Sequence, residues 1–138
     1  MSKDTLSPDK LEHLHHLARE AAGRAYAPYS RFPVGAALLT EDGRMFVGCN
    51  VENAAYPLGL CAERSAVSAM VVGGGGKIVA AVVYTPTPTP ASPCGACRQV
   101  LHEFGPQATV YSYCEGSAVA VHPLPTLLPE AFGPENLA

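Results

Sequence analysis

The chain has 138 residues, 48% of them hydrophobic, and a formal net charge of −3 at pH 7. This apolar content excludes a disordered chain, and the length predicts a single domain over residues 1–138. Nine Lys and Arg residues stand against twelve Asp and Glu residues, and they form no basic run. Nucleic acids and anionic membranes call for a basic patch, so neither is expected as a partner.

The N-terminal segment up to Pro8 has no apolar h-region, so no signal peptide is expected. No apolar run is long enough to span a bilayer. Both features predict a cytoplasmic protein with reduced thiols. In that compartment the five cysteines are expected to be metal ligands or buried thiols rather than disulfide partners.

The first third of the chain predicts a helix followed by a hairpin. Ser7 is a suitable N-cap, and apolar residues then recur at three- and four-residue steps until Pro28 ends the helix. The members of this apolar face are Leu11, Leu14, Ala18, Ala21 and Ala25. Residues 32–40 and 45–49 are predicted to be strands joined by a tight turn at Asp42-Gly43.

The middle of the chain predicts a loop, a helix and a buried strand. After a loop over residues 50–60, a second helix is expected from about Cys61 to the glycine run 73–76. Residues 78–84 form a continuous apolar run, which indicates a strand covered on both faces. The Thr-Pro repeat over residues 85–90 predicts a stiff extended loop, because each proline removes a backbone donor.

The last third predicts a third helix from about Cys94 to Gly105, then two strands and a short helical tail at 124–132. The strands, residues 108–113 and 118–122, are separated by too few residues for a crossover and must be antiparallel neighbours. The fold class is therefore α/β, with helices on both faces of a mixed five-stranded sheet in three α/β/α layers.

Three cysteines have a spacing suited to a metal ion. Cys94 and Cys97 lie one helical turn apart on one face, and Cys61 begins another helix. Helix N-termini lower thiol pKa values and donate N–H groups to sulfur. A lone Cys-x-x-Cys could be a redox pair, but thioredoxin-like pairs lie near an early βαβ unit. No fourth ligand is evident, and an open position is typical of a catalytic zinc site.

Glu63 lies two residues after Cys61 and has two interpretations. It could be a first-turn acid favoured by the helix dipole, or a general acid and base. Zinc lowers the pKa of a bound water to about 7, and a neighbouring carboxylate can carry the proton to a ring nitrogen and then to leaving ammonia. A Cys₃ site with a nearby Glu and a Pro-Cys-x-x-Cys element is known from zinc nucleobase deaminases.

Other reactive side chains receive plainer interpretations. Three thiolates and one Zn²⁺ sum to a charge of −1, which Arg64 could offset by hydrogen-bonding the sulfurs; the alternative is a surface ion pair. Cys49 and Cys114 have no partner at ligand spacing and are predicted to be small buried apolar residues. The histidines of the first helix, His13, His15 and His16, are predicted to form a solvated face.

Five sequence blocks extend the pattern beyond the metal motif. They are YSRFPVGAAL at 29–38, GCNVENAAY at 48–56, CAER at 61–64, PCGACRQ at 93–99 and LLPEAF at 127–132. In composition and order they resemble the small zinc-dependent, homotetrameric cytidine deaminases, and the resemblance covers roughly residues 8–138. The chain departs from the usual pattern in its glycine run and in the prolines of residues 85–90.

The resemblance implies hydrolytic deamination of cytidine and 2′-deoxycytidine to the uridines, in pyrimidine salvage, with one Zn²⁺ per subunit held by Cys61, Cys94 and Cys97. It also implies a homotetramer with shared active sites. In that arrangement Phe132 would reach into the site of a neighbouring subunit.

The resemblance also assigns roles to residues that spacing alone leaves unassigned. Asn50 and Glu52, otherwise two polar loop residues, match the pair that binds the sugar 3′-hydroxyl. Phe32, otherwise a core residue, matches an aromatic that packs on the pyrimidine ring. Tyr56 matches a loop residue near the sugar, and the backbone N–H of Ala62 is expected to meet the pyrimidine 2-oxo group.

Three other functions stay open at this point. A deaminase of a cytosine-bearing antibiotic, of the blasticidin type, shares the zinc blocks, although Asn50 and Glu52 favour a ribose-bearing substrate. A tRNA or DNA deaminase would need a basic strand-binding surface. A non-catalytic zinc-binding module is the alternative from a different class, and Glu63 together with the missing fourth ligand argues against it.

Overall fold

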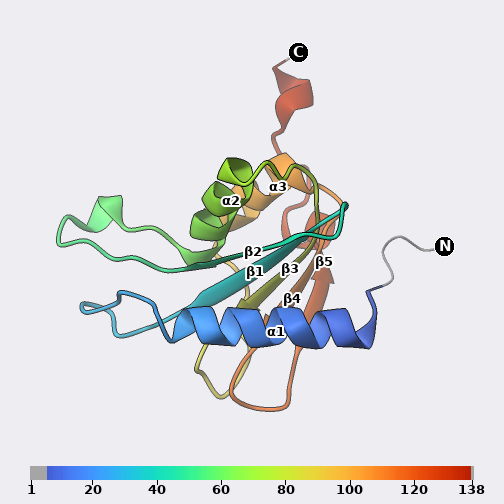
Figure 1. The fold of residues 1–138 in the computed structure, drawn as a ribbon. Coiled ribbons are helices and arrows are strands. Elements are labelled where there is room, and N and C mark those ends of the chain that lie inside the picture. The colour runs from blue at the N-terminus through green and yellow to red at the C-terminus, as the bar shows by residue number, and fades with distance from the viewer. Residues whose placement is uncertain (1–5, 138) are drawn as a thin grey trace.

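The computed structural model describes residues 6–137, whose course is shown in Figure 1. Residues 1–5 and residue 138 lie outside the described part. The N-terminal segment for which no signal peptide is expected begins with those first five residues. Within the described part, none of the helices combines the length and the apolar character needed to cross a membrane.

Within residues 6–137, five strands form one mixed sheet. They are β1 (Gly35–Thr40), β2 (Met45–Cys49), β3 (Ile78–Tyr84), β4 (Thr109–Tyr113) and β5 (Ala120–Pro123), in the spatial order β2-β1-β3-β4-β5. The β3–β4 pair is parallel, and the other three pairs are antiparallel. The predicted mixed sheet with an antiparallel last pair is confirmed.

Helices cover both faces of the sheet, so the predicted three layers are also confirmed. Helix α1 (Pro8–Ala22) packs on one face, and α2 (Ala62–Val72) and α3 (Gly95–Phe104) pack on the other (Figure 1). All six residues of β1 are buried, because each side chain meets a helix layer whichever way it points. Each face therefore has its own apolar core.

Two predicted boundaries differ from the structure for identifiable reasons. The strand predicted over residues 32–40 begins only at Gly35, because the backbone N–H of Val34 donates to the Asn50 side chain rather than to a neighbouring strand. The helical tail is limited to α4 (Leu124–Leu127), after which Leu128 leaves the helical region. Short 3₁₀ turns complete the chain, η1 at Tyr56–Leu58 and η2 at Pro134–Asn136.

The prediction of a solvated face for the first-helix histidines is wrong for His15. Its ring stacks on Tyr113 with the ring centroids 3.8 Å apart, whereas His13 and His16 are exposed. Position 15 lies beside the apolar stripe of α1 and reaches β4, which the sequence of α1 alone cannot show. Burial lowers the pKa of His15, although Glu12 opposes this shift.

Gly48 sets how closely β2 approaches the first turn of α2. A Cβ atom at this position would lie 2.4 Å from the backbone nitrogen of Ala66 and 2.6 Å from the carbonyl oxygen of Ala62. The helix can therefore rest directly on the strand only because residue 48 has no side chain. This contact holds the helix start that carries Cys61 and Glu63.

We expect Gly48→Ala to lower the free energy of unfolding by roughly 1–3 kcal/mol, because the added methyl group overlaps backbone atoms that cannot rotate away. Urea denaturation of the purified protein measures the change. The matched control is Gly76→Ala, where a Cβ meets no atom within 4 Å. Equal stability of the two variants would contradict a close contact at Gly48.

Candidate active site

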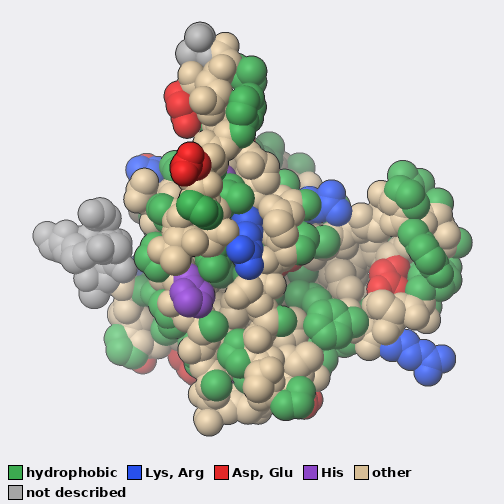
Figure 2. All heavy atoms as spheres, turned by 180° about the vertical axis from the view of Figure 1, so that it is seen from behind, with side chains coloured by type: hydrophobic (Ala, Val, Ile, Leu, Met, Phe, Trp, Pro, Cys, Tyr) green, Lys and Arg blue, Asp and Glu red, His purple; other side chains and the backbone are tan. Residues whose placement is uncertain are grey.

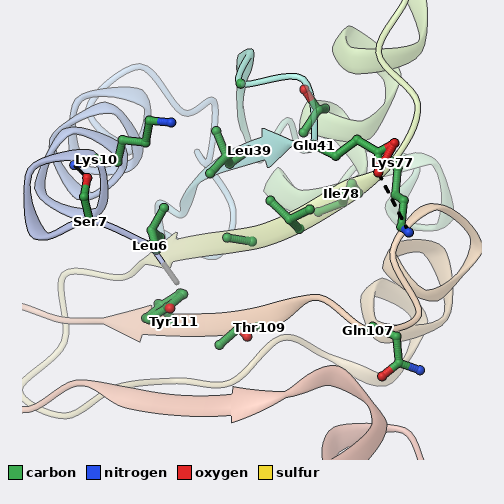
Figure 3. Close-up of a pocket in the computed structure, with 14 residues that line it drawn as sticks. Leu6, Ser7, Lys10, Leu39, Glu41, Lys77, Ile78, Gln107, Thr109 and Tyr111 are labelled. Atoms are coloured by element: carbon green, nitrogen blue, oxygen red, sulfur yellow. Dashed lines mark hydrogen bonds and ion pairs between the residues drawn. The ribbon is translucent and has the colours of Figure 1, made fainter. Parts of the chain in front are cut away.

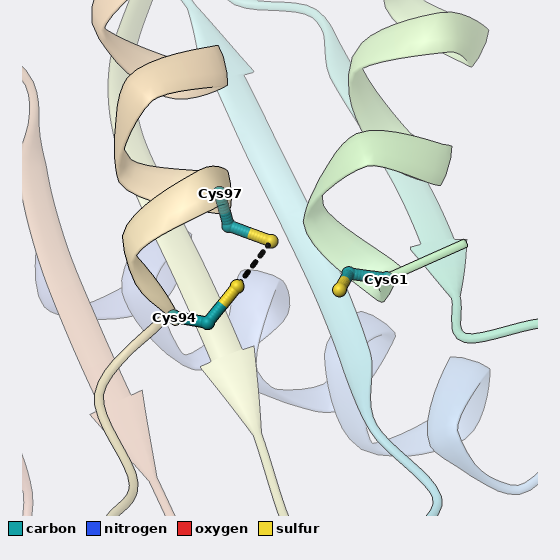
Figure 4. Close-up of side chains that lie close together, drawn as sticks. All are labelled: Cys61, Cys94 and Cys97. Carbon is teal, nitrogen blue, oxygen red and sulfur yellow. Dashed lines mark hydrogen bonds between the residues drawn. The ribbon is translucent and has the colours of Figure 1, made fainter. Parts of the chain in front are cut away.

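Three cysteine side chains converge from the starts of two helices. Cys61 and Cys94 are the N-cap residues of α2 and α3, and Cys97 lies in the first turn of α3. Figure 4 shows the sulfurs turned toward one another, and all three lie within 4.8 Å of each other. Zn–S bonds of about 2.3 Å in a tetrahedron separate sulfurs by about 3.8 Å. The spacing therefore fits a zinc ion.

The two thiols of α3 have pKa values shifted in opposite directions. For Cys94, burial alone would raise the pKa, but hydrogen bonding with the Cys97 backbone and thiol, with the Cys61 thiol and with the Ala96 N–H outweighs it and lowers the pKa. For Cys97, burial and the neighbouring Glu63 carboxylate raise the pKa. The N–H groups at the start of α3 thus favour a thiolate at Cys94.

Glu63, the second residue of α2, is only 4% exposed. Burial raises the pKa of its carboxyl group, and hydrogen bonds from its own backbone N–H and from the Cys97 thiol oppose the shift. The carboxyl group therefore lies against a sulfur of the cluster. A raised pKa brings proton uptake and release closer to neutral pH, as a general acid and base requires.

A hollow of about 470 Å³ opens beside the sulfurs at the carboxyl end of β3. This is the edge at which parallel strands and their following helices form ligand sites. Val83 and Thr85 contribute to its wall. The predicted site residues that line it are Phe32, Asn50, Glu52, Cys61, Ala62, Glu63, Cys94 and Cys97.

Tyr56 and Phe132 lie outside this hollow. Tyr56 is 75% exposed and borders a neighbouring hollow together with Glu52 and Tyr29. Phe132 is 58% exposed on the C-terminal tail, where its carbonyl oxygen accepts a hydrogen bond from Gln99. The described chain on its own does not bring either side chain to the sulfurs.

Arg64 is half-buried and forms no ion pair among the described residues, so the surface alternative does not hold. Its Nη2 donates to the carbonyl oxygen of Gly59 over 3.0 Å. Its Nε is buried and has no hydrogen-bond partner within the described chain. The hydrogen bond from Arg64 to a sulfur stays a prediction, and Nε is the donor free to make it.

The two polar residues predicted to bind the sugar also hold the wall of the hollow. The Oδ1 atom of Asn50 accepts from the Val34 N–H over 2.8 Å, and its Nδ2 donates to the Phe32 carbonyl over 2.9 Å. The Glu52 carboxylate accepts the backbone N–H groups of residues 29–30. Sequence reasoning identified these residues but missed that they fix the loop beside them.

Sequence reasoning also missed two residues of the site. The Nε atom of Arg98 donates to Pro93 and its Nη1 donates to Leu127, both over 2.8 Å, which ties the loop before Cys94 to α4. Thr85 is buried in the wall of the hollow. Arg98 belongs to the PCGACRQ block, but no local pattern reveals an acceptor 29 residues away.

A third hollow, of about 330 Å³, lies at the opposite end of β3 (Figure 3). Leu6, Ile78 and Tyr111 are among its lining residues, and Lys10 and Lys77 border it. None of the predicted site residues lines it. The chemistry therefore belongs to the hollow beside the sulfurs.

An open cluster of thiols with a buried carboxyl group, on this α/β/α scaffold, defines the class of zinc-dependent nucleobase deaminases. Residues 8–113 match the family described as "Cytidine and deoxycytidylate deaminase zinc-binding region". The chain belongs to this family, as the sequence blocks indicated, and Cys61, Cys94 and Cys97 are positioned to bind its zinc ion.

Curated relatives and solved structures agree with this assignment. The chain is 45% identical to a cytidine deaminase of Sporosarcina psychrophila, covering 88% of this chain and 90% of that protein. It is 46% identical to a cytidine deaminase of Mycobacterium tuberculosis, with 87% of each covered. The crystal structure of cytidine deaminase from Burkholderia pseudomallei superposes with a TM-score of 0.84 at 46% identity, covering 88% of this chain and 98% of that one.

We expect the purified protein to hold one Zn²⁺ per chain and Cys94→Ala to lose it. Removing a ligand should weaken zinc binding by more than the roughly 10–100-fold that an outer-shell partner contributes. Metal analysis after dialysis against a chelator measures the retained zinc. Cys49→Ala, whose thiol lies outside the cluster, should retain it. Full zinc in Cys94→Ala would exclude Cys94 as a ligand.

Proposed function

We propose that this protein is a cytidine deaminase that converts cytidine and 2′-deoxycytidine to uridine and 2′-deoxyuridine with release of ammonia. The main support is the buried Glu63 carboxyl group, which lies against Cys97 at the wall of a hollow of nucleoside size. Relatives 45–46% identical over most of their length are cytidine deaminases. The reaction serves pyrimidine salvage in the cytoplasm and is carried out by one catalytic domain spanning residues 1–138.

Proton transfer is the task of Glu63. When bound, zinc supplies Lewis-acid chemistry that lowers the pKa of water to about 7. The Glu63 carboxylate takes a proton from the water that attacks C4 of cytosine and delivers it to ring N3. The carboxylate then takes the proton of the C4 hydroxyl group formed in the attack and passes it to the amino group. The C4–N bond breaks, ammonia leaves, and the C4 oxygen becomes the carbonyl of uridine. Proton shuttling of this kind contributes roughly 10²–10⁴-fold in rate.

The rest of the hollow is proposed to bind and orient the nucleoside. Ala62 is the first residue of α2, so its backbone N–H has no partner within the helix and can donate to the pyrimidine 2-oxo group. Phe32 offers an aromatic face to the ring. Asn50 and Glu52 bind the sugar 3′-hydroxyl, and Tyr56 lies near the sugar.

We propose that the active protein is a homotetramer whose subunits share active sites. The η1 loop and the C-terminal tail both project from the sheet and its helices in Figure 1. They carry exposed apolar side chains, namely Tyr56, Leu58, Phe132 and Leu137. Exposed apolar groups of this kind mark interaction surfaces, and Phe132 would then complete the site of a neighbour.

Neither nucleic acid nor membrane is proposed as a partner. On the face shown in Figure 2, the Lys and Arg side chains stand apart from one another and alternate with acidic and apolar groups. A phosphate backbone or an anionic bilayer is bound by clustered cations. A small nucleoside without phosphates makes no such demand.

We expect Glu63→Ala to keep its zinc and its fold and to lose nearly all turnover, at least the roughly 10²–10⁴-fold assigned to the proton carrier. The fall in ultraviolet absorbance as cytidine becomes uridine measures the reaction, and metal analysis is the control. Residual activity within a few-fold of wild type would remove Glu63 from this role. Folded, zinc-bound wild type without cytidine turnover would redirect the search to cytosine antibiotics and then to a binding module.

We expect Phe132→Ala to raise the KM for cytidine roughly tenfold, because an aromatic side chain contributes about 1–2 kcal/mol when it is buried against a ligand. Its zinc content should not change, since Phe132 lies outside the thiol cluster. Steady-state kinetics with metal analysis tests both points. Val72→Ala, which truncates an exposed apolar side chain at the end of α2, is the control. Unchanged kcat and KM in Phe132→Ala would show that the tail does not complete a neighbouring site.

A further inference from the structure

Ser30 connects two parts of the substrate hollow through one hydroxyl group. Its Oγ donates a hydrogen bond to Oε2 of Glu52. The same Oγ accepts the backbone N–H of Phe32 over 3.1 Å. Ser30, Phe32 and Glu52 all line the hollow beside the sulfurs. The hydroxyl group thus links the aromatic wall to the carboxylate.

The Glu52 carboxylate is nearly saturated by this loop. Its Oε1 accepts the N–H groups of Tyr29 and Ser30 over 2.9 and 3.1 Å, and its Oε2 accepts the Ser30 hydroxyl. A carboxylate offers about four lone-pair sites. Three are occupied, so one acceptor position on Oε2 is left for a ligand hydroxyl. The direction of this free acceptor position is set by the hydrogen bond from the Ser30 hydroxyl, which prevents the carboxylate from rotating.

The backbone between Ser30 and Phe32 needs this support. Arg31 has φ of 58°, in the left-handed region that costs a non-glycine residue roughly 1–2 kcal/mol. The turn it makes brings the Phe32 N–H back to the Ser30 hydroxyl. The Phe32 side chain then projects from a backbone fixed by two hydrogen bonds: the Phe32 N–H donates to the Ser30 hydroxyl, and Asn50 donates to the Phe32 carbonyl oxygen.

We propose that Ser30 is a positioning residue whose hydroxyl orients Glu52 and Phe32 to receive the sugar and the base of the nucleoside. This inference rests on the proposed function, because it takes the sugar 3′-hydroxyl as the ligand of Glu52. Ser30 is exposed and contributes nothing to either apolar core. Its hydroxyl can be removed without unfolding the protein, since Asn50 and the N–H groups on Oε1 still hold the loop.

Ser30→Ala, assayed as zinc-loaded full-length protein, should raise the KM for cytidine roughly five- to tenfold, which is the net contribution of about one hydrogen bond. The kcat should stay within about twofold, because the thiol cluster and Glu63 are untouched. Ser30→Thr, which keeps the hydroxyl, should restore the KM. Ser117→Ala, on the exposed β4–β5 turn, is the control for loss of a serine hydroxyl.

A substrate without the sugar 3′-hydroxyl distinguishes an effect on the orientation of Glu52 from a general disturbance of the loop. With 2′,3′-dideoxycytidine, Ser30→Ala should raise the KM by a smaller factor than with cytidine, because Glu52 then has no 3′-hydroxyl to receive and only the effect through Phe32 remains. An equal rise in KM for cytidine and the dideoxy compound, or no rise for either, would overturn the proposal.

A titration that needs no turnover tests the same contact. Several hydrogen bonds hold the pKa of Glu52 below its usual range, and the one from the Ser30 hydroxyl contributes most to this shift. Ser30→Ala should therefore raise the Glu52 pKa, measured by ¹³C NMR on carboxyl-labelled protein. If wild type fails to deaminate cytidine, the proposed function fails, and this titration alone tests whether the Ser30 hydroxyl positions the Glu52 carboxylate. An unchanged Glu52 pKa in Ser30→Ala would overturn that positioning role.

Discussion

The site depends on the meeting of two helix N-termini at one edge of the sheet, and the strand order enforces that meeting. Cys49, Gly35, Tyr84 and Tyr113 lie in register across β2, β1, β3 and β4. Strands β2 and β3 therefore end at the same edge, and each is followed by a helix that begins there and runs back over the sheet. Because α2 and α3 pack on the same face, Cys61 and the α3 cysteines must lie close together.

This topology also explains the electrostatics of the cluster. Three thiols and the Glu63 carboxyl group are gathered where anionic forms would repel one another. Burial and this crowding raise the pKa of Cys97, and burial raises the pKa of Glu63. Two helix N-termini and the nearby Arg64 supply the opposing positive charge. A divalent cation would complete the balance, which is why the same geometry that disfavours four bare anions suits zinc.

Much of this arrangement could be predicted from sequence, because local chemistry specifies it. Apolar periodicity predicted the helices, and Asp42-Gly43 predicted the turn that joins β1 to β2. The spacing of the cysteines predicted the metal ligands and a catalytic rather than a structural zinc site. What could not be predicted depends on contacts distant in sequence. The stacking of His15 on Tyr113 spans 98 positions, and the bond from Arg98 to Leu127 joins two elements whose packing no local pattern encodes. Strand β1 began late because a side chain, Asn50, replaced a neighbouring strand as the partner of Val34.

The two walls of the hollow are built on different principles. The thiols and Glu63 stand on helices whose positions are fixed by apolar packing and by Gly48. The opposite wall is a loop that polar side chains hold, and two of these, Asn50 and Glu52, are also the proposed sugar ligands. A substitution at either would therefore disturb the wall and remove a ligand contact together, so a rise in KM alone cannot separate the two effects. Ser30 has no proposed contact with the substrate, so its hydroxyl is the group through which the orientation of Glu52 can be varied without removing a group that contacts the sugar.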